Sequence, residues 1–361
     1  MANTNLHSAK RAKNDEFYTR LQDIEAELKH YRQFNAADPS QNFNHFQNKV
    51  VFCNCDDPNW SNFWRYFTIN FDSLGLKKLI STHYEMDGSP SYAMILDRDS
   101  STGAINDYGH NADGMPLGRR VELTGNGDFR SPECAAFLEE SDIVVTNPPF
   151  SLFREYVQQL MAYGKQFLIL GSMNAITYKE IFPLIKNDQM WFGNHTGAMM
   201  FEIPTVAVGK NVVEENGVTY QKFGNILWYT NLDHKKRHEN LPLFRYYEDD
   251  ADMFPSYDNY DAINVDRVKD IPCDYEGVMG VPITFLDKYN PEQFKILGID
   301  RYIEDNPKPG KRFTINNKEI YARILIRNLH PTPKPASINN TAGGPPQDAR
   351  AALNALIEEE A

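Results

Sequence analysis

The sequence predicts an α/β fold in which a doubly wound sheet has helices on both faces. Short apolar runs alternate with segments of helical spacing up to about residue 192. Residues 143–145 are β-branched and continuously apolar, which favours a central parallel strand that is covered on both sides. After residue 193 the alternation ends, and short apolar runs separated by turns indicate an α+β region.

The first elements predict two β-α-β steps. Residues 16–31 repeat apolar and aromatic side chains at helical spacing and predict the first helix. Residues 49–55 predict a strand, residues 60–71 an aromatic-rich helix, and residues 79–84 a second strand that ends at Glu85. We expect the two strands to be parallel, because a helical crossover joins them.

The next stretch, residues 86–120, is rich in Gly, Asp, Asn and Ser and predicts an inserted hairpin with a long loop. The alternation of strands and helices then resumes. It predicts strands at 121–123, 143–146, 167–170 and 190–192, and helices at 132–140, after residue 150 and at 178–185.

The composition divides the chain into three segments. Residues 1–195 hold the regular alternation, and residues 196–330 hold the last strands of the sheet followed by the α+β region. Residues 331–361 begin with a stretch rich in Pro, Gly and Asn and end in a stripe of Ala and Leu. This last segment predicts a flexible linker and a short C-terminal helix.

The overall composition is that of a globular protein. At 41% hydrophobic residues the chain can form one large core or two ordinary ones, and no run approaches the roughly 20 apolar residues that span a bilayer. We therefore expect a soluble cytoplasmic protein. The four cysteines are scattered, which predicts neither a metal site nor a disulfide framework. The net charge of −12 argues against coating nucleic acid through bulk electrostatics, although local basic clusters permit contacts.

The most informative motif is Asn147-Pro148-Pro149-Phe150, directly after the buried strand. Open α/β sheets bind ligands at the carboxyl ends of their strands. The Asn147 side-chain oxygen and the Pro148 carbonyl are two acceptors that match a planar amine, and Phe150 offers a ring face for stacking. The alternative is that Asn-Pro-Pro is only a turn between a strand and a helix.

Several motifs in a fixed order resemble the EcoRI-type adenine-specific (N6) DNA methyltransferase family over about residues 10–330. They are DEFYTR at 15–20, CNCDDPNWSNF at 53–63, GDFRS at 127–131, SDIVVTNPPFSLFREY at 141–156, YDNYDAINV at 257–265 and GVMGVPITFL at 277–286. The resemblance implies a Rossmann-like S-adenosylmethionine-dependent methyltransferase core with a C-terminal α+β target-recognition region. It also implies a monomer that acts on double-stranded DNA within restriction-modification.

The resemblance implies donor-binding residues for S-adenosylmethionine. Glu85 would take the ribose hydroxyls and Asp128 the adenine amine of the donor. Asp15, Tyr18 and Thr19 would bind its methionine end, and Asn147 would also contact it. The first motif, with Asn54 and Asp56, lacks the glycine-rich turn that is usual in such enzymes. Asp56 would therefore either bind the methionine amine or hold the loop.

The implied reaction is in-line attack of adenine N6 on the sulfonium methyl group, without a metal. Asn147 and Pro148 would stabilise the charge that develops on N6, and Phe150 would stack on the flipped base. Phe201 or Trp228 would cover its other face, unless they are ordinary core aromatics. The alternatives are an RNA adenine or a protein glutamine amide as acceptor, or a DNA-binding module without turnover.

Overall fold

The computed structural model describes residues 18–112, 114–195, 197–203, 211–215, 217–303 and 310–335. Within these ranges the chain forms two compact units that divide between His234 and Lys235. The predicted boundary at residue 195 lies before this division, because the strands within residues 199–230 still belong to the first unit. Asp15 and most of the predicted tail lie outside the described residues.

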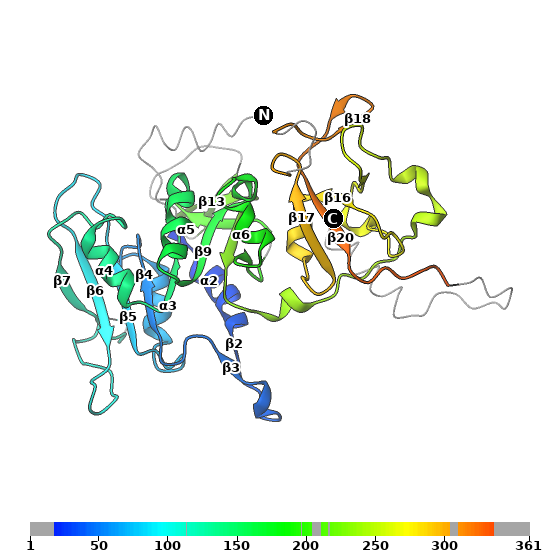
Figure 1. Cartoon of the computed structure of the whole chain (residues 1–361). Coiled ribbons are helices and arrows are strands. Elements are labelled where there is room, and N and C mark those ends of the chain that lie inside the picture. The colour runs from blue at the N-terminus through cyan, green and yellow to red at the C-terminus, as the bar shows by residue number, and fades with distance from the viewer. Residues whose placement is uncertain are drawn as a thin grey trace. The chain divides into compact units, whose positions relative to one another are not determined.

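The first unit is built on an eight-stranded sheet with the order β10-β14-β9-β8-β4-β5-β6-β7 (Figure 1). Its strands are β4 (Val50–Cys53), β5 (Lys78–Thr82), β6 (Tyr92–Asp97), β7 (Arg119–Glu122), β8 (Ile143–Thr146), β9 (Gln166–Ser172), β10 (Trp191–Phe192) and β14 (Ile226–Thr230). The protein is therefore a mixed α/β structure with a large central sheet.

The centre of this sheet is parallel, as predicted. Strand β4 pairs in parallel with β5 and β8, and β8 pairs in parallel with β9. The outer strands are antiparallel: β14 pairs with β9, β6 with β5, and β7 with β6. The predicted inserted hairpin thus extends the edge of the sheet, which makes the sheet mixed instead of uniformly parallel.

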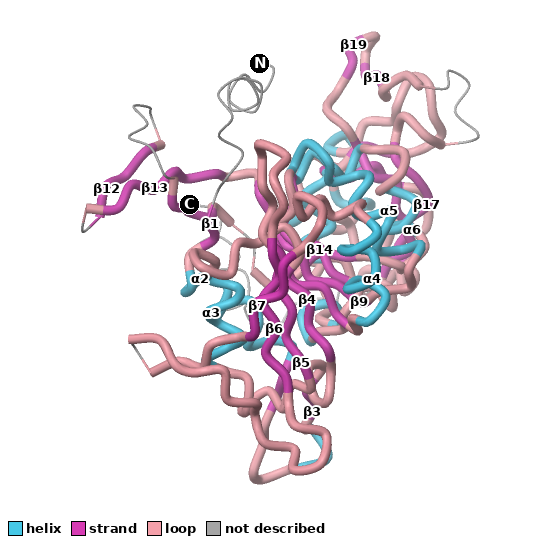
Figure 2. The backbone as a smooth tube through the Cα atoms, turned by 90° about the vertical axis from the view of Figure 1, so that its left-hand side faces the viewer, coloured by secondary structure: helices cyan, strands magenta, loops and turns pink. Residues whose placement is uncertain are grey.

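Helices cover both faces of the sheet (Figure 2), with α2 (Leu21–Leu28) and α3 (Asn62–Ile69) on one side and α4 (Pro132–Glu140) and α5 (Phe153–Ala162) on the other. The short helix α6 (Phe182–Lys186) follows β9. Successive side chains of β4 accordingly point to opposite faces of the sheet. Val51 and Cys53 join the core with α2 and α3, whereas the Phe52 ring lies 6.1 Å from the Phe137 ring of α4.

A small antiparallel sheet brings two distant segments together. It has the order β1-β11-β13-β12, with β1 (Tyr18–Thr19), β11 (Met199–Glu202), β12 (Val212–Glu215) and β13 (Val218–Phe223). Tyr18 pairs with Glu202, and Thr19 pairs with Phe201. The helix predicted at 16–31 consequently begins only at Leu21. Strands β2 (Arg32–Gln33) and β3 (Phe43–Asn44) form a separate hairpin.

The second unit contains a four-stranded sheet with the order β15-β16-β20-β17. Its strands are β15 (Ile263–Asn264), β16 (Met279–Pro282), β17 (Phe294–Ile299) and β20 (Arg323–Asn328), and β18 (Thr314–Ile315) pairs with β19 (Lys318–Glu319). Tyr257 and Phe313 stack within its core, with ring centroids 4.6 Å apart. Across the described ranges of both units, no helix is long and apolar enough to cross a membrane.

Candidate active site

A cavity of about 500 Å³ lies at the carboxyl ends of β4, β5 and β8 in the first unit. This volume is within the range of small-molecule sites. The residues that line it include Tyr18, Thr19, Asp56, Asp128 and residues 147–150. Four sequence motifs that lie far apart in the chain, each predicted to carry function, therefore meet at one site.

The Asn-Pro-Pro-Phe motif forms the turn that leaves β8. The strand ends at Thr146, whose hydroxyl donates a hydrogen bond to the Asn54 carbonyl and so ties β8 to the end of β4. A 3-10 helix, Phe150–Leu152, then leads into α5. Pro148 and Pro149 restrict the backbone of this turn. All four residues of the motif line the cavity, and Phe150 is half-buried against the core.

The turn after β4 lacks glycine but still adopts a glycine-like conformation. Cys55 has a positive φ of 60°, a region that costs about 1–2 kcal/mol for a residue with a Cβ atom. Asn54 stabilises this turn, because its side-chain oxygen accepts from the Cys55 amide and from the Thr82 hydroxyl, both at 2.9 Å. Asn54 is buried, and it is not among the residues that line the cavity.

Asp56 presents an enclosed carboxyl group to the cavity. Burial raises its pKa to about 8, and the neighbouring Asp57 adds to the shift, whereas a hydrogen bond from the Ser61 hydroxyl opposes it. The same hydroxyl caps α3 by accepting from the amides of Phe63 and Trp64 at 3.0 and 3.3 Å. Asp56 is therefore held at the start of α3 and is largely protonated at neutral pH.

Asp128 also lines the cavity and is an ionised acceptor. The Arg130 guanidinium donates to both of its carboxylate oxygens, at 2.8 and 2.6 Å, and holds the pKa of Asp128 below its ordinary value. Gly127 precedes it with a φ of 80°, and a Cβ atom there would lie 1.9 Å from the His83 carbonyl oxygen. Glycine is thus required where this loop passes the end of β5.

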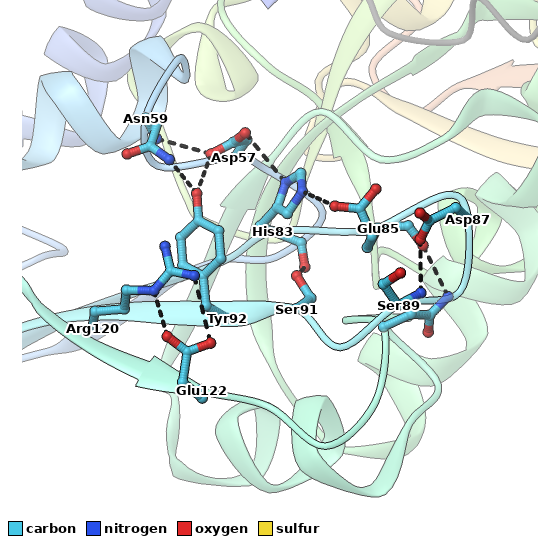
Figure 3. A network of polar contacts seen from close by, with 11 residues as sticks. Asp57, Asn59, His83, Glu85, Asp87, Ser89, Ser91, Tyr92, Arg120 and Glu122 are labelled. Carbon is cyan, nitrogen blue, oxygen red and sulfur yellow. Dashed lines mark hydrogen bonds and ion pairs between the residues drawn. The ribbon is translucent and has the colours of Figure 1, made fainter.

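Glu85 lies at the edge of the cavity but not in its wall. Its carboxylate contacts His83, and His83 contacts Asp57 (Figure 3). Both Asp57 and His83 line the cavity, and neither was predicted as a site residue. The position of Asp57 just after a buried strand was an available signal for it. His83 had no such signal, because its role depends on two carboxylates from different loops.

The structure corrects the two candidates for the second stacking aromatic. Phe201 and Trp228 are both fully buried in the main core, where Phe201 packs on Phe223 and Trp228 on Phe63. Neither lines the cavity. Because strands β11 and β14 turn these rings inward, they cannot present a face to a base without opening the core. The sequence pattern placed them on strands but could not show which face was covered.

The chemistry of the cavity is that of oxygen acceptors around an apolar wall. Asn147 and Pro148 offer acceptors for an amine, and Asp56, Asp57 and Asp128 offer carboxyl groups for hydroxyl or cationic groups. Within the described part of the chain, no three His, Cys, Asp or Glu side chains are grouped so that they could hold a metal ion. The four cysteines are free.

Comparisons with known proteins identify methyltransferases. Residues 5–329 match the family described as "Adenine-specific methyltransferase EcoRI". The chain is 47% identical to Type II methyltransferase M.EcoRI of Escherichia coli, covering 90% of this chain and 96% of that one. It is 40% identical to Type II methyltransferase M.MpnI of Mycoplasma pneumoniae, covering 89% and 97%. No solved structure matches it.

Proposed function

Since the chain belongs to the EcoRI family of adenine-specific methyltransferases, we propose that it methylates N6 of an adenine that is flipped out of double-stranded DNA. It is an enzyme, a methyltransferase whose relatives are named Type II. The observation that carries the proposed site is the position of residues 147–150 in the cavity at the end of β8. We propose S-adenosylmethionine as the donor and a Rossmann-like arrangement for the core.

The residues of the cavity fit this donor. The Thr19 hydroxyl is buried at the cavity and has no hydrogen-bond partner among the residues that the structure describes. Asp56 offers an enclosed carboxyl group that an ammonium would ionise, and Asp128 offers an acceptor for an amine. Tyr18 lines the same wall as Thr19. When bound, the donor supplies an electrophilic methyl group on a sulfonium centre.

The protein contributes position and electrostatic stabilisation. The Asn147 side-chain oxygen and the Pro148 carbonyl would accept the two N–H groups of the target amine, which aligns its lone pair and stabilises the positive charge that develops on nitrogen. Phe150 would stack on the base, which offsets part of the few kcal/mol that extraction from the duplex costs. These acceptors stabilise the charge on N6, and the proton that N6 loses after the transfer would pass to solvent.

We propose that the second unit reads the DNA target. Arg245 and Arg267 both approach the buried Asp270, at 3.4 and 3.6 Å, and their side chains remain 57% and 64% exposed. Asp270 therefore holds two guanidinium groups at the surface of this unit. Exposed arginines of this kind bind phosphates or base edges. We also propose that the protein acts as a monomer.

The test of the proposed function is an incubation with labelled donor and, in separate reactions, plasmid DNA, RNA and protein. We expect label in DNA, and mass spectrometry of the digested DNA should show N6-methyladenine. Label in protein or RNA alone would rule out duplex DNA as the substrate. Binding to DNA without any labelled product would indicate that the protein is a methyltransferase-like DNA-binding module without turnover.

Phe150→Ala should weaken the binding of a flipped base while leaving the donor site intact. Stacking of a base on an aromatic ring contributes about 1–3 kcal/mol, so we expect the Kd for duplex DNA to rise about five- to 150-fold. The measurement is fluorescence of 2-aminopurine placed at the target position, which increases when the base leaves the stack. Phe150→Tyr keeps the ring and serves as the control. Equal losses in both variants would contradict stacking.

Donor affinity should increase with pH because of Asp56. Its pKa is raised to about 8, so below that pH the carboxyl is mostly protonated and a cationic ligand must displace the proton. The affinity for S-adenosylhomocysteine should therefore rise by up to about tenfold per pH unit up to pH 8 and level off above it. Calorimetry across this range measures it, with Asp56→Asn as the control. An identical profile in that variant would assign Asp56 to the loop alone.

A further inference from the structure

A histidine at the edge of the cavity bridges two carboxylates (Figure 3). Nδ1 of His83 lies 3.2 Å from Oδ2 of Asp57, and Nε2 lies 3.1 Å from Oε2 of Glu85. Neutral imidazole carries a single N–H group, so only the protonated ring can donate to both carboxylates. Both contacts together are therefore satisfied by a ring that carries two N–H groups.

The Asp57 side of this bridge is anchored to the sheet. Oδ1 of Asp57 accepts from the Tyr92 hydroxyl at 2.8 Å and from the Asn59 amide at 3.0 Å. The Tyr92 ring is buried, lies 5.3 Å from the His83 ring, and is covered by the Arg120 guanidinium at 3.7 Å. Strands β6 and β7 therefore fix Asp57 and the plane of the imidazole.

The Glu85 side is open. The second carboxylate oxygen of Glu85 has no hydrogen bond to any residue that the structure describes, and the side chain is 38% exposed. Its neighbours Tyr84 and Met86 both line the cavity. Glu85 follows the end of β5 on a loop, and among the described residues His83 is the one whose side chain contacts its carboxylate.

We propose that His83 is a positioning residue, which donates to the Glu85 carboxylate and holds it toward the vicinal hydroxyls of the donor ribose. This inference rests on the proposed function, since it assigns a role within the donor site. The chain of contacts runs from Tyr92 through Asp57 and His83 to Glu85. Asp57 holds the ring, and the ring holds the ligand-binding carboxylate.

The groups around His83 come from several elements. Asp57 and Glu85 face its two nitrogens, the Tyr92 phenol faces the ring, and Arg120 lies beyond Tyr92. The Ser91 hydroxyl donates to the His83 carbonyl, at 2.7 Å. A side chain at position 83 that cannot donate toward Glu85 would therefore leave that carboxylate without this contact.

The two amide replacements of histidine separate its nitrogens. The amide nitrogen of Asn occupies roughly the place of Nδ1 and that of Gln the place of Nε2. His83→Gln therefore retains a donor toward Glu85, whereas His83→Asn retains one only toward Asp57. Asp87→Asn is a matched control, because Asp87 lies on the same loop and accepts from the Ser89 amide without contacting His83.

The experiment measures Kd by calorimetry for S-adenosylhomocysteine and for its analogue without the two ribose hydroxyls. We expect the wild type and Asp87→Asn to prefer the natural ligand about tenfold or more, because hydrogen bonds to a charged group are strong. His83→Gln should keep most of this preference, and His83→Asn should reduce it to about twofold or less.

The outcomes distinguish this inference from the proposed function. If the wild type does not bind S-adenosylhomocysteine, the proposed donor is wrong. If it binds but does not discriminate between the two ligands, or if His83→Asn leaves the preference unchanged, the role of His83 is refuted. An equal loss in Asp87→Asn would also refute it.

Discussion

Asn147→Ala should reduce the rate of methyl transfer to duplex DNA by about 10²–10³-fold, which is the typical effect of losing one positioned group that stabilises developing charge. Asn147 lines the cavity at the end of β8, and its side-chain oxygen is one of two acceptors for the target amine. Binding of S-adenosylhomocysteine should change by less than about threefold, since most donor contacts lie elsewhere. Single-turnover rates with labelled donor measure the loss.

Two further variants make this result specific. Asn147→Asp retains an acceptor at the same position, so we expect a smaller loss than in Asn147→Ala. Asn70→Ala removes the same amide group from the end of α3, where it bonds to the Tyr66 carbonyl away from the cavity, and should leave the rate unchanged. Normal methyl transfer by Asn147→Ala would show that the proposed mechanism is wrong.

The elements that the sequence predicted well are marked by features of their own local sequence. Helix α4 was expected at 132–140 and spans Pro132–Glu140, because Ser131 caps it, a proline opens its first turn and the apolar spacing ends before Ser141. The central strands were visible because they are buried on both faces and therefore continuously apolar. Strand β1 was not, since its two residues pair with β11 across a long stretch of chain.

The same distinction applies to the site. Asn147, Asp56 and Asp128 follow strands or lie in turns at the edge of the sheet, and all three line the cavity. Asn54 also follows β4, but its side chain turns toward Thr82. The pairing of His83 with Asp57 and Glu85 depends on the exact course of two loops, which local sequence does not specify. Position along a strand is therefore predictable, whereas the direction of a side chain is not.

Trp228→Ala should lower the free energy of unfolding by about 3–5 kcal/mol, the usual cost of removing a large buried aromatic side chain. Trp228 is fully buried on β14 and packs edge-on against Phe63 of α3, with ring centroids 6.0 Å apart. Its indole N–H has no hydrogen-bond partner within the described residues, so Trp228→Phe should cost less than about 1.5 kcal/mol. Denaturant unfolding monitored by circular dichroism measures both changes.

Trp60→Ala provides the matched comparison, because Trp60 is 73% exposed and its loss should change the free energy of unfolding by no more than about 0.5 kcal/mol. The contrast separates the two roles considered for Trp228. If Trp228 is a core residue, Trp228→Ala lowers the stability of the protein. DNA binding then weakens only in proportion to the fraction of protein that is unfolded. If Trp228→Ala kept wild-type stability but lost binding to DNA containing a flipped base, Trp228 would be a stacking residue and its placement in the core would be wrong.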